Sequence, residues 1–250
     1  MADNELWDKH AQWWIDGFTG GVDPEYEEQI IPLACEELSG FTTILDVGCG
    51  DGQIARALAA QGSDVLGIDP TELHISIARE RAGGPRYEMG SALHLPVANN
   101  SQDAVVACLV FEHIDDVDTA LSEVARVLKP GGQFSFFLNH PLLQTPGSGW
   151  IDDHIIDPPE QYWRIGPYLV ETESIEEVEK DVYIRFLHRP LSRYINSLIA
   201  HGLFIERMLE PSPPQGFLDR APEYALAHTV PRLLYLRSIK RAPSMGNLTS

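Results

Sequence analysis

The sequence predicts an α/β fold in which helices cover both faces of a mostly parallel sheet. Between residues 41 and 140, short apolar runs alternate with segments whose apolar residues recur every three or four positions, as in successive strand–helix units. The run AVVACLV at 104–110 is continuously apolar, which is typical of a central strand covered on both faces. A chain of 250 residues has room for one large domain with insertions or for two small domains.

Two strand–helix units open this region. A helix with Ile54 and Leu58 on its buried face follows the first expected strand at 44–47. The second expected strand, at 65–68, leads into a helix that begins near Pro70, since proline is favoured in the first helical turn.

The remaining strands of this region are expected at 86–89, 104–110 and 134–138. Before the last of them, Val117, Leu121 and Val124 lie on one face of a helix. The segment LKPGG at 128–132 then predicts a turn, because proline and two glycines cannot continue the helix.

Residues 1–40, which precede this region, are expected to form a helical cover. Gly20-Gly21 divides it into two pieces; Asp23 is a capping residue for the second piece, and Pro32 is expected to kink or interrupt it.

The segment after this region begins with an insertion at residues 141–187, which carries five prolines and few regular patterns. It follows the carboxyl end of a parallel strand, where open α/β sheets bind their ligands, so we expect it to form a lid or a substrate wall. Residues 188–240 should then add a helix and the last strands of the same domain, the final strand antiparallel. Residues 241–250 predict a flexible tail.

The amino-acid composition of the chain limits the classes of molecule that it is expected to bind. Eighteen Lys and Arg against thirty-seven Asp and Glu give a formal charge of −19, which argues against nucleic acid or an anionic membrane and favours a small-molecule substrate. No apolar stretch is long enough to span a bilayer and the acidic first residues do not resemble a signal peptide, so we expect a cytoplasmic protein.

Three cysteines without a CxxC pair predict neither a disulfide framework nor a metal site. Neither composition nor motifs indicate an oligomeric state.

The segment ILDVGCGDG at 44–52 carries the clearest chemical signal. Gly48, Gly50 and Gly52 allow a sharp turn and leave no Cβ where a ligand would press against the loop, so we expect a nucleotide-type site. The spacing is GxGxG, whereas a dinucleotide fingerprint would need a small residue in place of Gln53. Asp69, at the end of the second expected strand, can accept hydrogen bonds from ribose hydroxyls.

These residues and LKPGG resemble the class I S-adenosylmethionine-dependent methyltransferases, in particular the group that acts on small molecules. The resemblance covers residues 41–140 at the level of motifs and 186–239 more loosely. It implies a Rossmann-like sheet of seven strands with a lid insertion after the fifth. It also makes residues 41–140 the S-adenosylmethionine-binding core.

The resemblance also assigns cofactor contacts. Asp46 and residues 48–52 match the first motif, which lies against the methionine part of the cofactor, and Asp69 matches the acid that holds the ribose. Ser91 stands where the family often has an acid facing the adenine, so backbone groups near Ala92 and Leu93 are the alternative contact. The cofactor residues implied are Asp46, Gly48, Cys49, Gly50, Gly52, Asp69, Pro70, Ser91, Ala92, Leu93, Cys108 and Leu109.

Two histidines are candidates for a base that acts on the acceptor. His140 ends the fifth expected strand and His188 precedes the last long helix, so both should border the crevice. Each could instead anchor a loop through its ring nitrogens. His113, in FEHI after the fourth strand, has either a structural or a pocket-lining role.

Two aromatic groups have alternative roles as packing residues or as a cover over the substrate. They are Trp7, Trp13 and Trp14 near the beginning, and Trp150, Tyr162, Trp163 and Tyr168 in the insertion.

The sequence thus predicts an S-adenosylmethionine-dependent enzyme that methylates an oxygen, nitrogen or carboxylate of a small molecule, mainly by positioning it. The alternatives are a non-catalytic module that binds adenosylmethionine and, with less support, a nicotinamide-dependent oxidoreductase. A methyltransferase acting on RNA or protein is disfavoured by the acidic charge.

Overall fold

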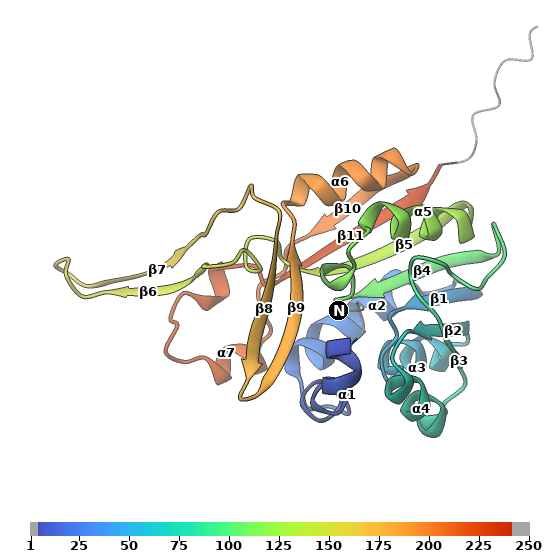
Figure 1. Cartoon of the computed structure of the whole chain (residues 1–250), viewed down its shortest axis with the longest axis horizontal. Helices are drawn as coiled ribbons and strands as arrows, with labels where there is room; N and C mark the ends of the chain where they lie inside the picture. Colours follow the sequence, from blue (N-terminus) through green and yellow to red (C-terminus); the bar gives the residue numbers. More distant parts are fainter. Residues whose placement is uncertain (1–4, 242–250) are drawn as a thin grey trace, which may run out of the picture.

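A seven-stranded sheet runs through the centre of the computed structural model, which describes residues 5–241 (Figure 1). Its strands are β1 (Thr43–Val47), β2 (Asp64–Asp69), β3 (Arg86–Met89), β4 (Gln102–Cys108), β5 (Leu128–Asn139), β10 (Leu203–Leu209) and β11 (Leu233–Lys240). Their order in space is β10-β11-β5-β4-β1-β2-β3. Strands β1 to β5 pair in parallel, whereas β11 is antiparallel to both of its neighbours. The expected seven-stranded sheet with an antiparallel last strand is confirmed.

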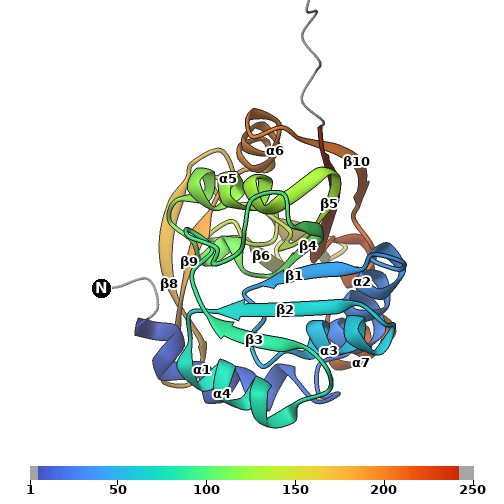
Figure 2. The ribbon, with the colours of Figure 1, turned by 90° about the vertical axis from the view of Figure 1, so that its right-hand side faces the viewer.

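Helices cover both faces of this sheet (Figure 2). On one face lie α2 (Ile31–Glu37), α3 (Gln53–Ala60) and α4 (Glu72–Arg81), and on the other lie α5 (Val117–Val127) and α6 (Leu191–Ala200). Along β4, Val105 packs with the side chains of α5, and Val106 packs with those of α3. Successive strand residues face opposite sides of a sheet, so the uninterrupted apolar run reflects burial on both faces.

The segment LKPGG at 128–132 is part of β5 instead of a separate turn before it. Gln102 of β4 pairs with Leu128, but Ala104 pairs with Gln133, so the pairing skips several residues of β5. Gly131 has φ +82°, a conformation that favours glycine. The expected change of direction therefore occurs as an irregularity within the strand.

The N-terminal segment consists of α1 (Glu5–Phe18), a π-helical turn η1 (Tyr26–Ile30) and α2. Gly20 and Gly21 both have positive φ and separate α1 from the rest. Asp23 Oδ1 accepts a hydrogen bond from Glu25 N at 2.7 Å, in keeping with the capping role expected of Asp23. Pro32 does not break the helix; its place at the start of α2 follows the change from π-helix to α-helix.

The insertion forms two separate hairpins. Strands β6 (Gly149–Asp153) and β7 (Glu160–Arg164) make an arm that projects from the body, whereas β8 (Thr172–Glu179) and β9 (Val182–His188) lie beside α1 (Figure 1). On the arm, Trp150 stacks on Tyr224 with ring centroids 5.6 Å apart. Trp150 and Trp163 of the arm therefore pack on one another, and Trp150 also packs on the C-terminal segment.

The C-terminal segment completes the sheet. After β10, the short helix α7 (Gln215–Arg220) and the 3₁₀ turn η3 (Ala227–Thr229) lead into β11. Of the tail expected at 241–250, all but Arg241 lies outside the described residues. In the part of the chain from 5 to 241, no helix has the length and apolar character needed to cross a membrane.

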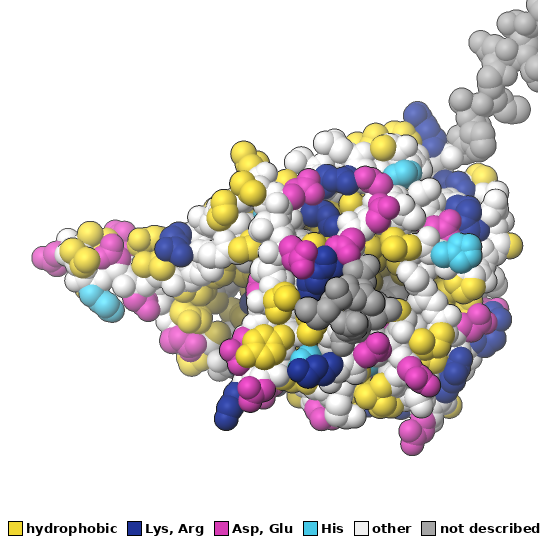
Figure 3. Space-filling model, in the orientation of Figure 1, with side chains coloured by type: hydrophobic (Ala, Val, Ile, Leu, Met, Phe, Trp, Pro, Cys, Tyr) yellow, Lys and Arg dark blue, Asp and Glu magenta, His cyan; other side chains and the backbone are white. Residues whose placement is uncertain are grey.

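Charged side chains of both signs are interspersed on the face shown in Figure 3. On this face Lys and Arg side chains do not gather in a broad patch, as they do where a protein neutralises a phosphate backbone.

Glu37 fastens α2 to the antiparallel edge of the sheet. Its carboxylate is almost completely buried and accepts a hydrogen bond from the Tyr235 hydroxyl at 2.9 Å. It also pairs with Arg207 of β10 and with Arg237 of β11. A buried carboxylate is tolerated when opposite charges and hydrogen bonds compensate for the lost water.

Replacing Glu37 with Ala should lower the free energy of unfolding by about 2–4 kcal/mol, because one hydroxyl and two guanidinium groups lose their common partner. Urea denaturation followed by circular dichroism measures this change. The matched control is Glu36→Ala, since the Glu36 side chain is 71% exposed. The control should change stability by less than about 0.5 kcal/mol, and equal losses in the two variants would contradict the assignment.

Candidate functional site

The loop between β1 and α3 is bound tightly to the neighbouring strand. Gly48 N and Cys49 N both donate to Ile68 O of β2, at 2.7 and 3.0 Å. Gly48 has φ +72°, and a Cβ on it would lie 2.3 Å from a methyl carbon of Val110. Glycine is therefore required at this position both by the backbone and by the close approach of the chain after β4.

Gly52 has a different role from the one expected. It precedes α3 with φ +86°, and a Cβ on it would lie 2.3 Å from the Tyr87 hydroxyl oxygen. Gly52 does not line the cavity described next. Its lack of a side chain serves the packing of Tyr87 and the start of the helix.

A first cavity of about 1030 Å³ opens above the glycine loop at the carboxyl ends of the strands. Of the residues expected to bind a cofactor, those that line it are Asp46, Gly48, Cys49, Gly50, Asp69, Pro70, Ser91, Ala92, Leu93, Cys108 and Leu109.

The first cavity is also lined by residues that the sequence did not assign to the site, namely Tyr26, Thr71, His74, Gly90, Val110 and Ile114. Thr71 and Gly90 each lie within two residues of an assigned position, so their neighbours in the motifs could have indicated them. No local signal marks Tyr26, which reaches the cavity from η1.

Two buried carboxyl groups lie side by side in this cavity. Asp69 Oδ2 accepts a hydrogen bond from Gly50 N at 3.0 Å, and Asp69 Oδ1 accepts one from Thr71 N at 2.9 Å. Burial, and next the charge of Asp69, raise the pKa of Asp46 to about 7. Asp46 Oδ2 is buried without a hydrogen-bond partner among residues 5–241. The pair is thus suited to a ligand that brings hydrogen-bond donors and positive charge.

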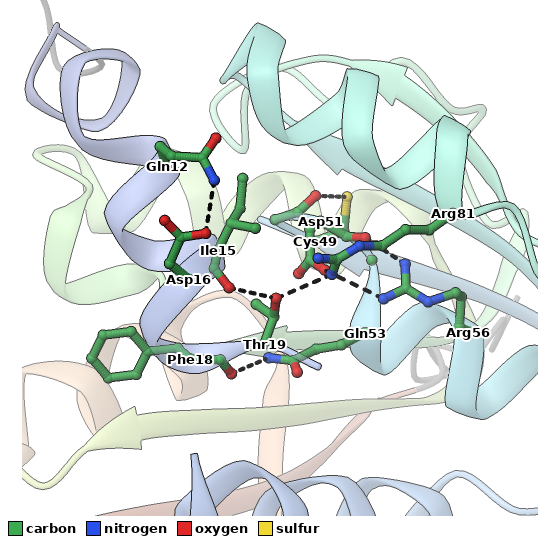
Figure 4. A network of polar contacts seen from close by, with 12 residues as sticks. Gln12, Ile15, Asp16, Phe18, Thr19, Cys49, Asp51, Gln53, Arg56 and Arg81 are labelled. Atoms are coloured by element: carbon green, nitrogen blue, oxygen red, sulfur yellow. Dashed lines mark hydrogen bonds and ion pairs between the residues drawn. The ribbon is translucent and has the colours of Figure 1, made fainter. Parts of the chain in front are cut away.

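Asp51 connects the glycine loop to two helices (Figure 4). Its buried carboxylate pairs with Arg56 of α3 and with Arg81 of α4. Arg81 Nη1 also donates to Thr19 Oγ1 at 3.1 Å, just beyond the end of α1. This network holds the end of α1 against the loop.

A second cavity of about 950 Å³ adjoins the first. The two cavities share the residues Trp7, Trp14, Tyr26, Leu109 and His113. The second cavity is further enclosed by Trp13 and Phe18 of α1 and by Ile184 and Phe186 of β9. Of the two roles considered for Trp7, Trp13 and Trp14, enclosure of a cavity is the one that the geometry favours.

His113 lies at the boundary between the cavities. It ends the 3₁₀ turn η2 (Phe111–His113), and its ring packs edge-on against Trp7, with centroids 5.0 Å apart. His113 Nδ1 is 2.7 Å from Arg185 O of β9. A carbonyl oxygen only accepts, so Nδ1 carries the hydrogen and Nε2 carries the lone pair. Burial lowers the pKa of His113 to about 4, which keeps the ring neutral near pH 7.

His140 and His188 do not border either cavity, which corrects the expectation from the sequence. His140 Nε2 is 2.7 Å from a carboxylate oxygen of Glu210, and its Nδ1 accepts a hydrogen bond from Leu142 N. His188 Nε2 is 2.8 Å from Tyr168 O. Both rings fasten loops, which was the alternative considered for them.

Unlike these two residues, His74 of α4 lines the first cavity. Its Nδ1 is 3.4 Å from Asp69 Oδ1 but at an angle that makes no hydrogen bond, and neither ring nitrogen has a partner among residues 5–241.

The residues of the first cavity fit S-adenosylmethionine, the cofactor that the resemblance implies. Gly48 and Gly50 leave room beside the loop, and the unpartnered Asp46 oxygen matches a ligand with an ammonium group. Asp69 retains acceptor capacity for ribose hydroxyls at the end of β2. Among the described residues, no group of three or more His, Cys, Asp or Glu could hold a metal ion.

Comparison with known proteins agrees with this fit. A family model described as a methyltransferase domain matches residues 45–136. A solved S-adenosylmethionine dependent methyltransferase from Mesorhizobium loti is 28% identical, with a TM-score of 0.71 and coverage of 84% of this chain and 95% of that one. A putative S-adenosylmethionine dependent methyltransferase from Listeria monocytogenes shares the fold, with a TM-score of 0.72, 24% identity and coverage of 86% and 97%.

Curated relatives match over a shorter stretch. A ubiquinone biosynthesis O-methyltransferase from Sinorhizobium fredii is 34% identical over 142 residues, which are 49% of this chain and 56% of that protein. The chain thus spans about half the length of the curated relatives it matches. The family model covers the strands that carry the glycine loop and Asp69, and the solved methyltransferase from Mesorhizobium loti aligns along most of this chain. Residues 45–136 are therefore a methyltransferase domain, and the chain has the fold of the class I S-adenosylmethionine-dependent methyltransferases.

Proposed function

We propose that this protein transfers a methyl group from S-adenosylmethionine to a hydroxyl oxygen of a small molecule held in the second cavity. The observation that carries the proposal is the wall shared by the two cavities, because ligands in adjoining cavities can meet at Trp7, Leu109 and His113. The name O-methyltransferase of the relative from Sinorhizobium fredii supports oxygen as the acceptor atom.

When bound, S-adenosylmethionine supplies an electrophilic methyl group on a cationic sulfur, which keeps the electron pair of the broken bond. The residues of the chain hold the acceptor in line with this bond and exclude water. His113 Nε2 takes the proton that the acceptor hydroxyl loses and returns it to solvent, which is the role first considered for His140 and His188. Residues 41–140 bind the cofactor in this scheme, while α1 walls both cavities and the β8–β9 hairpin encloses the second.

The non-catalytic module and the nicotinamide-dependent oxidoreductase predict different ligand responses. We expect S-adenosylhomocysteine to raise the melting temperature and NADH to leave it unchanged, because ligands that bind only the folded state stabilise it. A screen of metabolite pools with isotope-labelled S-adenosylmethionine, read by mass spectrometry, should then yield a methylated product. If the protein bound the cofactor but methylated nothing in this screen, the result would favour the non-catalytic module.

Replacing Asp69 with Ala should weaken the binding of S-adenosylhomocysteine by about 1–3 kcal/mol, since ribose hydroxyls lose an acceptor and Gly50 N loses its partner. Isothermal titration calorimetry measures this loss. Asp64→Ala is the matched control, because Asp64 begins the same strand with a carboxylate 61% exposed. Unchanged affinity in Asp69→Ala would refute the ribose assignment.

The affinity for S-adenosylmethionine should rise with pH between about 5.5 and 7.5, because Asp46 must lose its proton to face a cationic ligand. The pKa of Asp46 is about 7 in the folded protein, so below it each pH unit should cost up to about tenfold in affinity. Calorimetry over this pH range measures the slope, which Asp46→Asn should flatten.

Glu112→Gln is the control for this slope. Burial also raises the pKa of Glu112 to about 7, but Glu112 does not line the first cavity. Its replacement should preserve the slope, and an identical slope in Asp46→Asn would show that another group is responsible.

Replacing His113 with Asn should lower turnover of the acceptor found in the screen by roughly 10²–10⁴, because the proton acceptor is lost. The Asn amide can still donate to Arg185 O, so binding of S-adenosylhomocysteine should be preserved. His140→Asn is the control, since His140 lies outside both cavities, and it should turn over at the parent rate. If His113→Asn turned over the acceptor at the parent rate, His113 would not be the base, and catalysis would depend on positioning alone.

A further inference from the structure

Besides His113, a second hydrogen-bond acceptor of the second cavity is held in a fixed orientation. Asn139 lines this cavity at the end of β5, beside the end of β4 from which Leu109 follows. Its side-chain Nδ2 donates to Glu112 Oε1 at 2.8 Å, and its backbone N donates to the same oxygen at 3.1 Å. Because the NH₂ group is turned toward Glu112, Asn139 Oδ1 is the acceptor that this side chain can offer to a ligand.

Glu112 acts on the cavity only through Asn139. Its side chain is buried and does not line either cavity. Burial raises the pKa of Glu112, while hydrogen bonds from its own backbone and from Asn139 oppose that rise. A carboxyl group is costly to bury, so its two bonds to one asparagine indicate a positioning role.

The rest of the second cavity is lined mainly by aromatic and aliphatic side chains, with Gln144 as a further amide, and its charges are largely compensated. Trp13, Phe18 and Phe186 contribute aromatic walls. Arg232 is held by Glu25 through two contacts, at 2.8 and 3.0 Å.

The remaining acid of this cavity is Asp23. Burial raises its pKa, so desolvation works against its charge. With the neutral ring of His113, these surroundings favour an uncharged ligand with flat apolar faces.

We propose that the second cavity selects an uncharged aromatic acceptor with two hydrogen-bond donors, one hydroxyl for His113 Nε2 and a neighbouring donor for Asn139 Oδ1. Glu112 is the positioning residue that presents Asn139 Oδ1. This inference rests on the proposed function in taking the second cavity as the acceptor site. It adds a selection by number of donors, because an acceptor that lacks the second donor leaves Asn139 Oδ1 without a partner.

The test uses the full chain saturated with S-adenosylhomocysteine, so that binding is measured without turnover. The probes are 2,3-dihydroxynaphthalene, 2-naphthol and 2,3-dimethoxynaphthalene, and the readouts are calorimetry and the fluorescence of the tryptophans in the cavity wall. The diol should bind about five- to tenfold more tightly than the mono-hydroxyl probe, and the dimethoxy probe should bind weakest.

Asn139→Leu should reduce the ratio of diol to mono-hydroxyl affinity to about one, since it removes the second acceptor. Glu112→Leu should reduce the same ratio, whereas Glu112→Gln should restore it, because a glutamine oxygen can still accept from Asn139. The control Asn196→Leu replaces an exposed amide on α6 and should leave the ratio unchanged. A general loss of structure would weaken all three probes and leave the ratio as it was.

Three results would overturn the inference. They are equal binding of the three probes, no binding of the diol, and a ratio that persists in Asn139→Leu. If S-adenosylhomocysteine itself did not bind, the proposed function would fail, and this result is separate because it is measured before any probe is added.

Discussion

The first cavity, at the carboxyl ends of the strands, depends on a loop in which residues 48 and 50 are glycines and therefore carry no side chains. Gly48 lets Val110 approach to a distance that no other residue would allow, and this contact places the segment after β4, including His113, beside the loop. The Gly50 N–H bonds to Asp69, so the same loop fixes the acid at the end of β2. A side chain at Gly48 would force apart the walls of the first cavity and move the boundary with the second.

Four of the buried acids in this structure divide into two kinds by how they are compensated. Glu37 and Asp51 are each bound by two arginines, and both fasten one helix to another part of the fold. Asp46 and Glu112 each keep one buried oxygen without a partner among residues 5–241. An unpaired buried oxygen is costly in a protein without ligand, so its retention points to function more clearly than a paired one does.

Most of the sheet and the first cavity could be predicted from the sequence, because strand, loop and acid lie within short motifs. The expected strand at 86–89 coincides with β3 despite its weak pattern. The histidines that line the cavities could not be predicted for a physical reason: the hydrogen-bond partners that orient the rings are distant in the chain. His140 bonds to Glu210, and His113 bonds to Arg185, 72 residues away. No periodicity or local spacing records which ring faces a cavity.

The N-terminal helix is a second case in which local spacing does not show which side chains face a cavity. This helix also links the two cavities. Trp7 and Trp14 have a spacing that is typical of ordinary helix packing, yet both line the two cavities. Helix α1 is held near one end by Arg81 and Thr19, and Trp13 Nε1 of this helix donates to Glu179 on the β8–β9 hairpin at 2.7 Å. Since one helix walls both cavities and touches both the glycine loop region and the hairpin, exclusion of water from the cofactor and from the acceptor depends on its position. The chemistry of both sites is therefore tied to a segment outside the motifs that identify the family.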